Sequence, residues 1–175
     1  MIVTLIRHTS VDVPQGTCYG FTDVPLKASF PQEAAKTASL LHDKHFDRIY
    51  SSPLSRALHL ASYCGYPDAI TDPRLKEINF GDWEMQRFDD IQDSNLQTWY
   101  DDYIHVAATH GESFMDQYKR VSAFLEDLKQ KNDAHVAIFA HGGVLICAQI
   151  YAQSLTFETA FSSITPYGGV IEITI

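Results

Sequence analysis

The sequence predicts an α/β protein with three layers, α/β/α, built around a mainly parallel central sheet. Short apolar runs rich in β-branched residues alternate with longer segments in which apolar residues recur every three or four positions. Strand and helix patterns that alternate in this way are typical of a parallel sheet covered by helices. Neither a linker nor an internal repeat divides the 175 residues, so we expect one domain over residues 1–175.

Each predicted element follows from its local pattern. Continuous apolar runs define the strands, and amphipathic spacing defines the helices. The loop 11–27 carries two prolines and two glycines, and loops of this length inside a domain are usually functional. In chain order the predicted elements are strand 1–6, loop 11–27, helix 29–44, strand 46–51, a helix opening at 52–53, an irregular segment 67–73 with room for a short strand, helix 88–104, helix 113–131, strand 135–140, helix 143–151 and strand 169–175.

Three of the helix starts carry recognisable capping residues. Ser29 is expected to cap its helix, with Gln32 three residues later completing a capping box. Ser52-Pro53 combines a cap with proline at the first helical position. Ser113 followed by Asp116 is an acidic version of the same signal and precedes the most regular helical pattern in the chain.

Charge and composition exclude several classes of partner. Thirteen basic residues stand against 22 acidic ones, a net charge of −9 without any cluster of Lys and Arg, so we expect no nucleic acid partner. No apolar run approaches the roughly 18 residues needed to cross a bilayer, and the N-terminus lacks the order of a signal peptide. The three cysteines are widely spaced, which fits reduced thiols in a cytoplasmic protein. The oligomeric state is left open.

Two predicted strands end in histidine. Arg7-His8 directly follows strand 1–6, and His141-Gly142-Gly143 directly follows strand 135–140. Ligands of open α/β sheets bind outside the carboxyl ends of the strands, so these side chains are candidates for one site. Arg56 lies in the first turn of a helix, where the helix dipole disfavours a cation but favours a bound anion. Each of these residues, taken alone, is also compatible with a structural role, and two glycines after a strand more often form only a tight turn.

Carboxylates for proton transfer come from the segment 75–84. Both Glu77 and Glu84 are candidates, and the residue pattern does not choose between them. The segment 110–113 precedes a clear helix, whose first amides are a possible addition to the anion site. A helix cap without a catalytic part is the more common role for such a segment.

Other chemistries fit less well. The Gly-Lys-Ser/Thr ending of a phosphate-binding P-loop is absent, and Gly111-Glu112-Ser113-Phe114-Met115 lacks the second glycine of a serine hydrolase elbow. His8, His141 and Glu77 are possible metal ligands by residue type, although the nearby arginines would repel a cation.

Together these segments resemble the histidine phosphatase superfamily, also called phosphoglycerate mutase-like. They occur in the family's order and cover nearly the whole chain. The stretch 16–26 looks most like the alpha-ribazole phosphatases of cobalamin biosynthesis. The matching segments are Leu5-Ile6-Arg7-His8, Ser51-Ser52-Pro53-Leu54-Ser55-Arg56-Ala57, Leu75-Lys76-Glu77, Phe80-Gly81-Asp82-Trp83-Glu84, Gly111-Glu112-Ser113 and Ala140-His141-Gly142-Gly143.

The resemblance implies a phosphoglycerate mutase-like fold and a phosphomonoester hydrolase that needs no metal and no cofactor. His8 would form a phosphohistidine, and Glu77 would exchange protons with the leaving alcohol and with water. Arg7, Arg56 and His141 would stabilise the phosphoryl oxygens. Substrate-binding positions are expected at Tyr19, Gly20, Thr22 and Gly142.

The resemblance also implies a small phosphorylated metabolite as the partner. Alpha-ribazole 5′-phosphate is the first candidate, and another sugar-phosphate-like metabolite or a non-catalytic phosphoryl-binding role are the alternatives. The family motif usually has glycine where this chain has Thr9, and the next residues also depart from it. Substrate choice is expected to rest on the segment 88–110, whose aromatic side chains would either stack on a flat base over the pocket or pack into the core.

Overall fold

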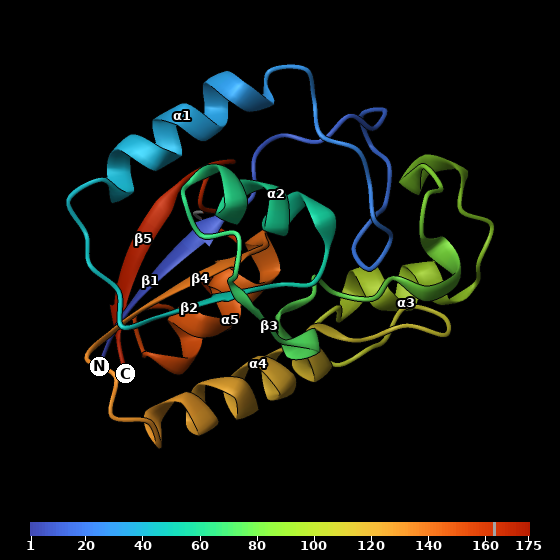
Figure 1. The fold of residues 1–175 in the computed structure, drawn as a ribbon. Coiled ribbons are helices and arrows are strands. Elements are labelled where there is room, and N and C mark those ends of the chain that lie inside the picture. Colours follow the sequence, from blue (N-terminus) through green and yellow to red (C-terminus); the bar gives the residue numbers. More distant parts are fainter. Residues whose placement is uncertain (163) are drawn as a thin grey trace.

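The computed structural model of the chain describes residues 1–162 and 164–175 and confirms the predicted mixed α/β fold (Figure 1). Five strands form one sheet in the order β3-β2-β4-β1-β5. The four strands from β3 to β1 are parallel, and β5 pairs with β1 in the antiparallel sense. The strands are β1 (Ile2–Arg7), β2 (Arg48–Ser51), β3 (Ile70–Thr71), β4 (His135–Ala140) and β5 (Val170–Thr174).

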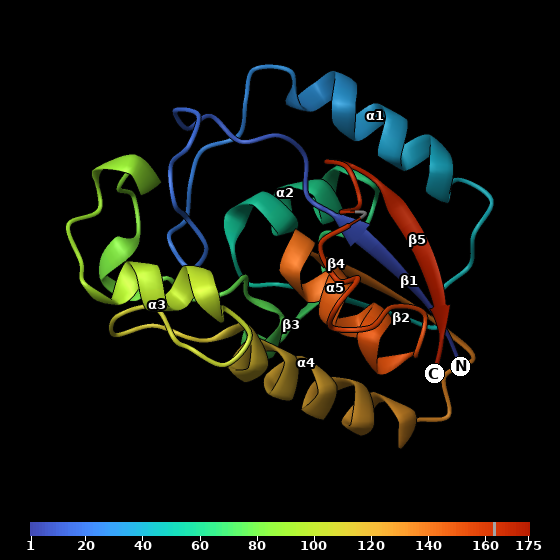
Figure 2. The same ribbon diagram turned by 180° about the vertical axis from the view of Figure 1, so that it is seen from behind.

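Helices cover both faces of this sheet, which gives the expected three layers (Figures 1 and 2). α1 and α2 pack their alanines and leucines on one face, against Ile6 and Phe139. α4 and α5 bury the other face, where Leu125 and Leu145 meet the side chains of β1 and β4. The helices are α1 (Phe30–Leu41), α2 (Ser55–Tyr63), α3 (Asn95–Asp101), α4 (Phe114–Lys129) and α5 (Gly142–Tyr151).

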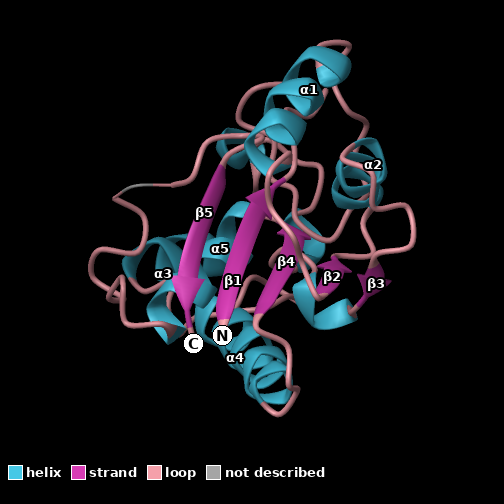
Figure 3. Ribbon diagram, turned by 60° about the vertical axis from the view of Figure 1, so that its left-hand side comes forward, coloured by secondary structure: helices cyan, strands magenta, loops and turns pink. Residues whose placement is uncertain are grey.

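The chain begins and ends at the same edge of the sheet. The backbone N–H of Ile175 donates to the carbonyl oxygen of Met1 at 3.0 Å, and the terminal amine of Met1 donates to Ile175 O at 3.0 Å. Figure 3 shows β5 beside β1, and Figure 1 shows α3 to one side of the sheet. In the described part of the chain, no helix is both long and apolar enough to cross a membrane.

The predicted helix 88–104 is wrong as a continuous element. Residues 88–90 form a single 3-10 turn, and α3 covers only residues 95–101. Asp93 interrupts the helix because its carboxylate accepts both the backbone N–H of Asn95, at 2.8 Å, and the indole N–H of Trp83, at 2.8 Å. A short acidic side chain that bonds locally in this way favours a turn over a helix interior.

Two of the predicted caps are also corrected. The Ser29 hydroxyl makes no capping bond and donates instead to the carboxylate of Glu33 at 2.6 Å. α2 begins at Ser55 and not at Pro53. The Ser52 hydroxyl oxygen accepts the backbone N–H of Leu54, two residues later, at 3.3 Å. The capping box of Ser113 and Asp116 is confirmed, with each side chain accepting the backbone N–H of the other residue.

Candidate active site

A cavity of about 580 Å³ opens at the carboxyl ends of β1 and β4. Its lining combines a few polar side chains with a larger number of apolar and aromatic ones. Sites for small ligands usually have this composition. Its lining residues are Arg7, His8, Thr17, Tyr19, Glu77, Ile78, Phe80, Phe88, Trp99, Tyr103, Phe114, Gln117, Gly142, Gly143, Ile146, Phe161 and Ile164.

His8 lies in this cavity with a fixed ring orientation. Its Nδ1 is 2.7 Å from the carbonyl oxygen of Thr9. Because a carbonyl only accepts hydrogen bonds, Nδ1 carries the proton of the neutral ring and Nε2 keeps its lone pair. Burial, together with the charges of Arg56 and Arg7, lowers the pKa of His8 to about 3. The ring is therefore neutral at neutral pH. The contact uses the backbone of Thr9, so it does not require the glycine that the family motif usually has there.

His141 lies beside His8, with 5.2 Å between the ring centroids. The sheet order explains this proximity, because His8, His141 and Ser52 follow the neighbouring strands β1, β4 and β2. His141 is fully buried, and its Nε2 is 2.7 Å from the Ser52 hydroxyl. Burial, followed by the effects of His8 and Arg56, lowers the pKa of His141 well below its usual value.

Two arginines place positive charge near His8, and both lower its pKa. Arg7 donates from Nη1 to the carbonyl oxygen of Thr165 at 2.6 Å, and its guanidinium lies 4.0 Å from the ring centroid of Tyr167. Arg56 is fully buried and is not one of the lining residues. Within the described residues, Arg7 Nε, Arg56 Nε and His141 Nδ1 are buried without a hydrogen-bond partner. Buried polar atoms are normally hydrogen-bonded, and all three residues lie close enough to His8 to affect it, so these nitrogens fit an anionic ligand.

The structure separates the two candidate carboxylates. Glu77 lines the cavity, where its Oε1 accepts from the Gln117 side chain at 2.7 Å and its Oε2 accepts from the Gly143 N–H at 3.1 Å. The other candidate, Glu84, accepts four backbone N–H groups, two on each oxygen. Glu77 also accepts the Ile78 N–H at 3.0 Å, so the difference between the two is their position: Glu77 lines the cavity and Glu84 does not.

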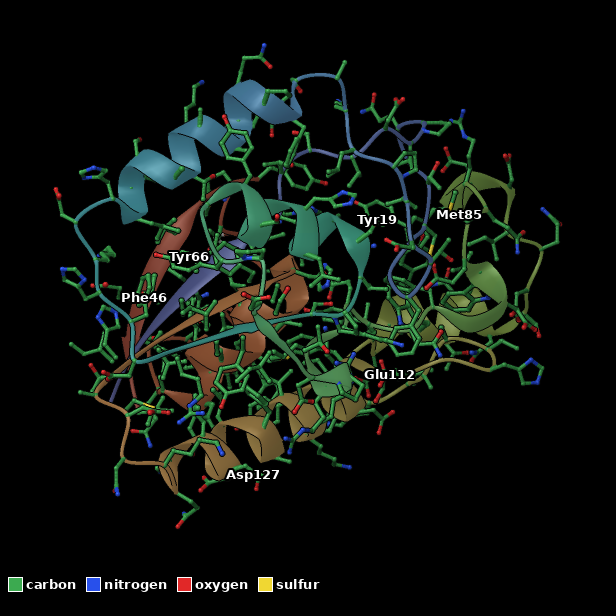
Figure 4. The ribbon with its side chains drawn as sticks, viewed as in Figure 1. Tyr19, Phe46, Tyr66, Met85, Glu112 and Asp127 are labelled. Carbon is green, nitrogen blue, oxygen red and sulfur yellow. The ribbon has the colours of Figure 1, made fainter. Side chains whose placement is uncertain are left out.

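The four expected substrate-binding residues lie in different positions. Tyr19 and Gly142 line the cavity, and a Cβ added at Gly142 would meet the Arg7 guanidinium at 3.4 Å. Gly20 and Thr22 are not among the lining residues, and their carbonyl oxygens accept from Arg56 at 2.6 and 3.0 Å. Figure 4 shows Tyr19 on the loop beside α2, at the end of the sheet opposite Phe46, which precedes β2.

The segment 110–113 does not contribute amides to this site. The first N–H groups of α4 are already bonded, since Phe114 N donates to Tyr103 O and Met115 N to Ile104 O. Glu112 forms an ion pair with Arg120 at 2.8 Å. Arg120 in turn donates to the carbonyl oxygen of Glu77 at 2.9 Å, so this region holds the backbone of the 74–77 segment.

The aromatic residues of the segment 88–110 lie over the cavity, as one of the two sequence hypotheses expects. Phe88, Trp99 and Tyr103 line it, and the rings of Phe88 and Trp99 stack at 6.1 Å between centroids with an interplanar angle of 19°. The rings of Phe88 and Trp99 also pack against the small hydrophobic cluster that contains buried Trp83. The hypothesis that these aromatic residues pack into the core is therefore correct for this pair as well.

Several contributors to the site were not singled out from the sequence. Gln117 is fully buried on α4 and holds Glu77, and the only sequence signal for it is a polar residue within the apolar stripe that includes Phe114 and Val121. Tyr167 contacts both Arg7 and His8 from a segment without a helical or strand pattern, which gives no local signal. Among the described side chains, no group of three or more His, Cys, Asp and Glu residues has the arrangement of a metal site.

Comparison with known proteins gives one consistent family. The model of the histidine phosphatase superfamily (branch 1) matches residues 3–175. An adenosylcobalamin/alpha-ribazole phosphatase of Escherichia coli (strain K12) is 34% identical over 155 residues, which cover 83% of this chain and 75% of that protein. Phosphoserine phosphatase 1 of Hydrogenobacter thermophilus is 29% identical over 146 residues, covering 78% of this chain and 69% of that protein.

The fold agrees with these sequence matches. The crystal structure of the alpha-ribazole phosphatase from Shigella flexneri has a TM-score of 0.91 and 30% identity, and the match covers 100% of this chain and 91% of that chain. The family model and these relatives support a phosphatase enzyme. The chain belongs to the histidine phosphatase superfamily, branch 1.

Proposed function

We propose that the protein hydrolyses a phosphomonoester through a phosphohistidine formed on His8, and that its substrate is alpha-ribazole 5′-phosphate. The observation that carries the reaction is the Nδ1 contact of His8 with the Thr9 carbonyl. This contact leaves the Nε2 lone pair available in a ring that stays neutral at neutral pH.

The proposed reaction has two steps. In the first, His8 Nε2 bonds to phosphorus while the bond from phosphorus to the ester oxygen breaks, and Glu77 gives its proton to the departing alcohol. In the second, water attacks phosphorus, Glu77 accepts a proton from that water, and the bond between Nε2 and phosphorus breaks to release phosphate. The position of Glu77 in the cavity beside His8 supports this role.

Positive charge and hydrogen-bond donors support the transferring group. We assign Arg7, Arg56 and His141 to the non-bridging oxygens of the phosphoryl group, because each has a buried nitrogen without a partner in the described structure. Fixed donors in a site that excludes water stabilise developing charge without reorganising. Tyr19 and Gly142 border the same space, whereas Gly20 and Thr22 act through Arg56, with which their carbonyls bond.

The aromatic wall favours alpha-ribazole phosphate over charged substrates. Among the described lining residues, Arg7 is the only lysine or arginine, and Phe80, Phe88, Trp99 and Tyr103 face the remaining space. A substrate such as phosphoserine carries a carboxylate that would need a second cation. A flat, uncharged base on a ribose would instead stack on aromatic rings. The relative from Escherichia coli, which is named for alpha-ribazole phosphate, supports the same choice.

A substrate panel tests this proposal. We expect kcat/KM for alpha-ribazole 5′-phosphate to exceed that for phosphoserine and for ribose 5-phosphate by about 100-fold, because the latter two leave the aromatic wall unused. Equal values for ribose 5-phosphate would assign the enzyme to a sugar phosphate instead. Absence of turnover on every monoester, p-nitrophenyl phosphate included, would indicate a protein that only binds phosphoryl groups. Loss of turnover after incubation with a chelator would contradict the metal-independent mechanism.

A further inference from the structure

Glu84 is not among the residues that line the cavity, and its carboxylate accepts hydrogen bonds from backbone N–H groups. Its carboxylate accepts the backbone N–H groups of Gly20 at 3.0 Å, Phe21 at 2.8 Å, Thr22 at 3.3 Å and Phe80 at 3.1 Å. Hydrogen bonds from N–H groups to an ionised carboxylate are among the stronger ones in proteins. Three of the four hold consecutive residues of the 11–27 loop, so this side chain fixes the conformation of one short segment.

The opposite side of that segment faces Arg56. The guanidinium donates from Nη2 to the carbonyl oxygen of Gly20 at 2.6 Å and from Nη1 to that of Thr22 at 3.0 Å. The segment 20–22 therefore lies between a carboxylate and a guanidinium. Its N–H groups point to the negative charge and two of its carbonyl groups point to the positive one, so both contacts reinforce the same backbone orientation.

The packing leaves this segment little freedom. A Cβ added at Gly20 would lie 1.8 Å from the carbonyl oxygen of Ile78, so the loop is pressed against the 78–84 segment. Asp23, the next residue, accepts the backbone N–H and the hydroxyl of Ser55, immediately before Arg56. Arg56 itself is fully buried, so these carbonyls satisfy its Nη1 and Nη2 groups, and a carboxylate oxygen of Asp23 lies 3.9 Å from Nη1.

We infer that Glu84 is a positioning residue that sets the orientation of Arg56 through the 20–22 backbone. The inference rests on the proposed role of Arg56 in binding the phosphoryl group. Each carboxylate oxygen of Glu84 accepts two N–H groups, so a glutamine would turn its own NH₂ group toward two donors. Glutamine, usually a conservative replacement for a surface glutamate, is thus a disruptive one here.

A double-mutant cycle with Arg56 distinguishes positioning from general stabilisation. We expect E84Q to lower kcat/KM for p-nitrophenyl phosphate at least 10-fold and to weaken inhibition by inorganic phosphate by a similar factor. In the Arg56→Ala background, E84Q should change kcat/KM less than 2-fold, because the residue that it positions is gone. Equal losses in both backgrounds, or no loss in either, would overturn the inference.

A matched control and a milder variant complete the experiment. Glu33 also accepts a backbone N–H, from Ser10 at 2.9 Å, directly before the 11–27 loop. Within the described residues it makes no hydrogen bond to the segment 20–22 or to Arg56, so Glu33→Gln should retain kcat/KM within 2-fold. If E84Q does not fold, E84D retains the charge with a shorter reach and is measured in the same cycle, with an intermediate loss expected only when Arg56 is present. Failure of both variants to fold would contradict a positioning role. Inactivity of the wild-type protein toward p-nitrophenyl phosphate, with no binding of inorganic phosphate, would refute the proposed function instead.

Discussion

The hydroxyl oxygens of Tyr19 and Tyr167 lie 2.9 Å apart and join the 11–27 loop to the segment that precedes β5. Tyr167 also lies against the Arg7 guanidinium, and its ring centroid is 5.5 Å from that of His8. Burial raises the pKa of Tyr19, so its hydroxyl keeps its proton at neutral pH. This pair of tyrosines therefore links the 11–27 loop to a side chain that packs against both Arg7 and His8.

Removing the Tyr167 hydroxyl should weaken substrate binding without abolishing the reaction. In Tyr167→Phe the ring still packs on Arg7, but the Tyr19 hydroxyl loses its partner. We expect KM to rise about 2- to 10-fold, the effect of one net hydrogen bond, with kcat little changed. Steady-state kinetics with p-nitrophenyl phosphate measures both parameters, and a fall in kcat without a change in KM would be inconsistent with this role.

Replacing Glu77 should affect substrates according to their leaving groups. Glu77→Gln should lower kcat/KM for alpha-ribazole 5′-phosphate by about 10²- to 10⁴-fold, because an alcohol needs a proton to leave. For p-nitrophenyl phosphate the loss in kcat/KM should be much smaller, since p-nitrophenolate leaves without protonation. Equal losses for the two substrates would show that Glu77 acts on binding or folding rather than as the acid.

The aromatic wall should matter only for the leaving group that uses it. Trp99 stacks on Phe88 at the cavity, so Trp99→Ala removes a contact surface for a flat base. We expect kcat/KM for alpha-ribazole 5′-phosphate to fall about 3- to 10-fold, in line with a single aromatic contact, while that for ribose 5-phosphate stays the same. A parallel decrease for both substrates would argue against base recognition by this wall.

Stability should fall in mild acid because of the buried histidines. An unfolded chain protonates His8 below about pH 6.5, whereas the folded protein does so only near pH 3, so stability is lost as the pH falls through this interval. At about pH 5 the loss from this group is about 2 kcal/mol in the free energy of unfolding. Burial lowers the pKa of His141 too, which acts in the same direction.

Urea unfolding of the wild type and of His8→Gln, at about pH 7.5 and about pH 5, measures this effect. The wild type should lose more of its unfolding free energy between the two conditions than the variant, which has no proton to bind at this position. The same loss in both proteins would show that His8 titrates normally in the folded state.

The sequence predicts those parts of the candidate site that directly follow the strands of the sheet. His8 and His141 end strands that pair directly, so their meeting follows from strand order once the sheet is parallel. The cap of α4 is also predictable, because Ser113 and Asp116 are three residues apart and form their bonds locally. Patterns confined to a few residues, or fixed by general sheet geometry, are thus sufficient for these features.

Other features depend on contacts between distant segments and leave no local pattern. The spacing of the aromatic residues from Phe88 to Tyr103 predicts one helix. In the structure these residues line the cavity or pack near Trp83, and the hydrogen bonds of Asp93 interrupt the helix. The choice between Glu77 and Glu84 is decided by backbone amides that come from the 11–27 loop. Residue type alone gives the chemistry that each carboxylate can perform, whereas tertiary structure shows that Glu77, and not Glu84, lines the cavity.

Trapping of the phosphoenzyme tests the central claim most directly. Wild-type protein is mixed with a phosphate-labelled monoester and quenched in alkali within the first turnover, and the labelled peptide is identified by mass spectrometry. We expect an acid-labile, alkali-stable phosphoryl group on His8, and no labelling in His8→Ala, which should also lose about 10³-fold or more in kcat/KM. Label on another residue, or turnover by His8→Ala close to that of the wild type, would contradict the mechanism.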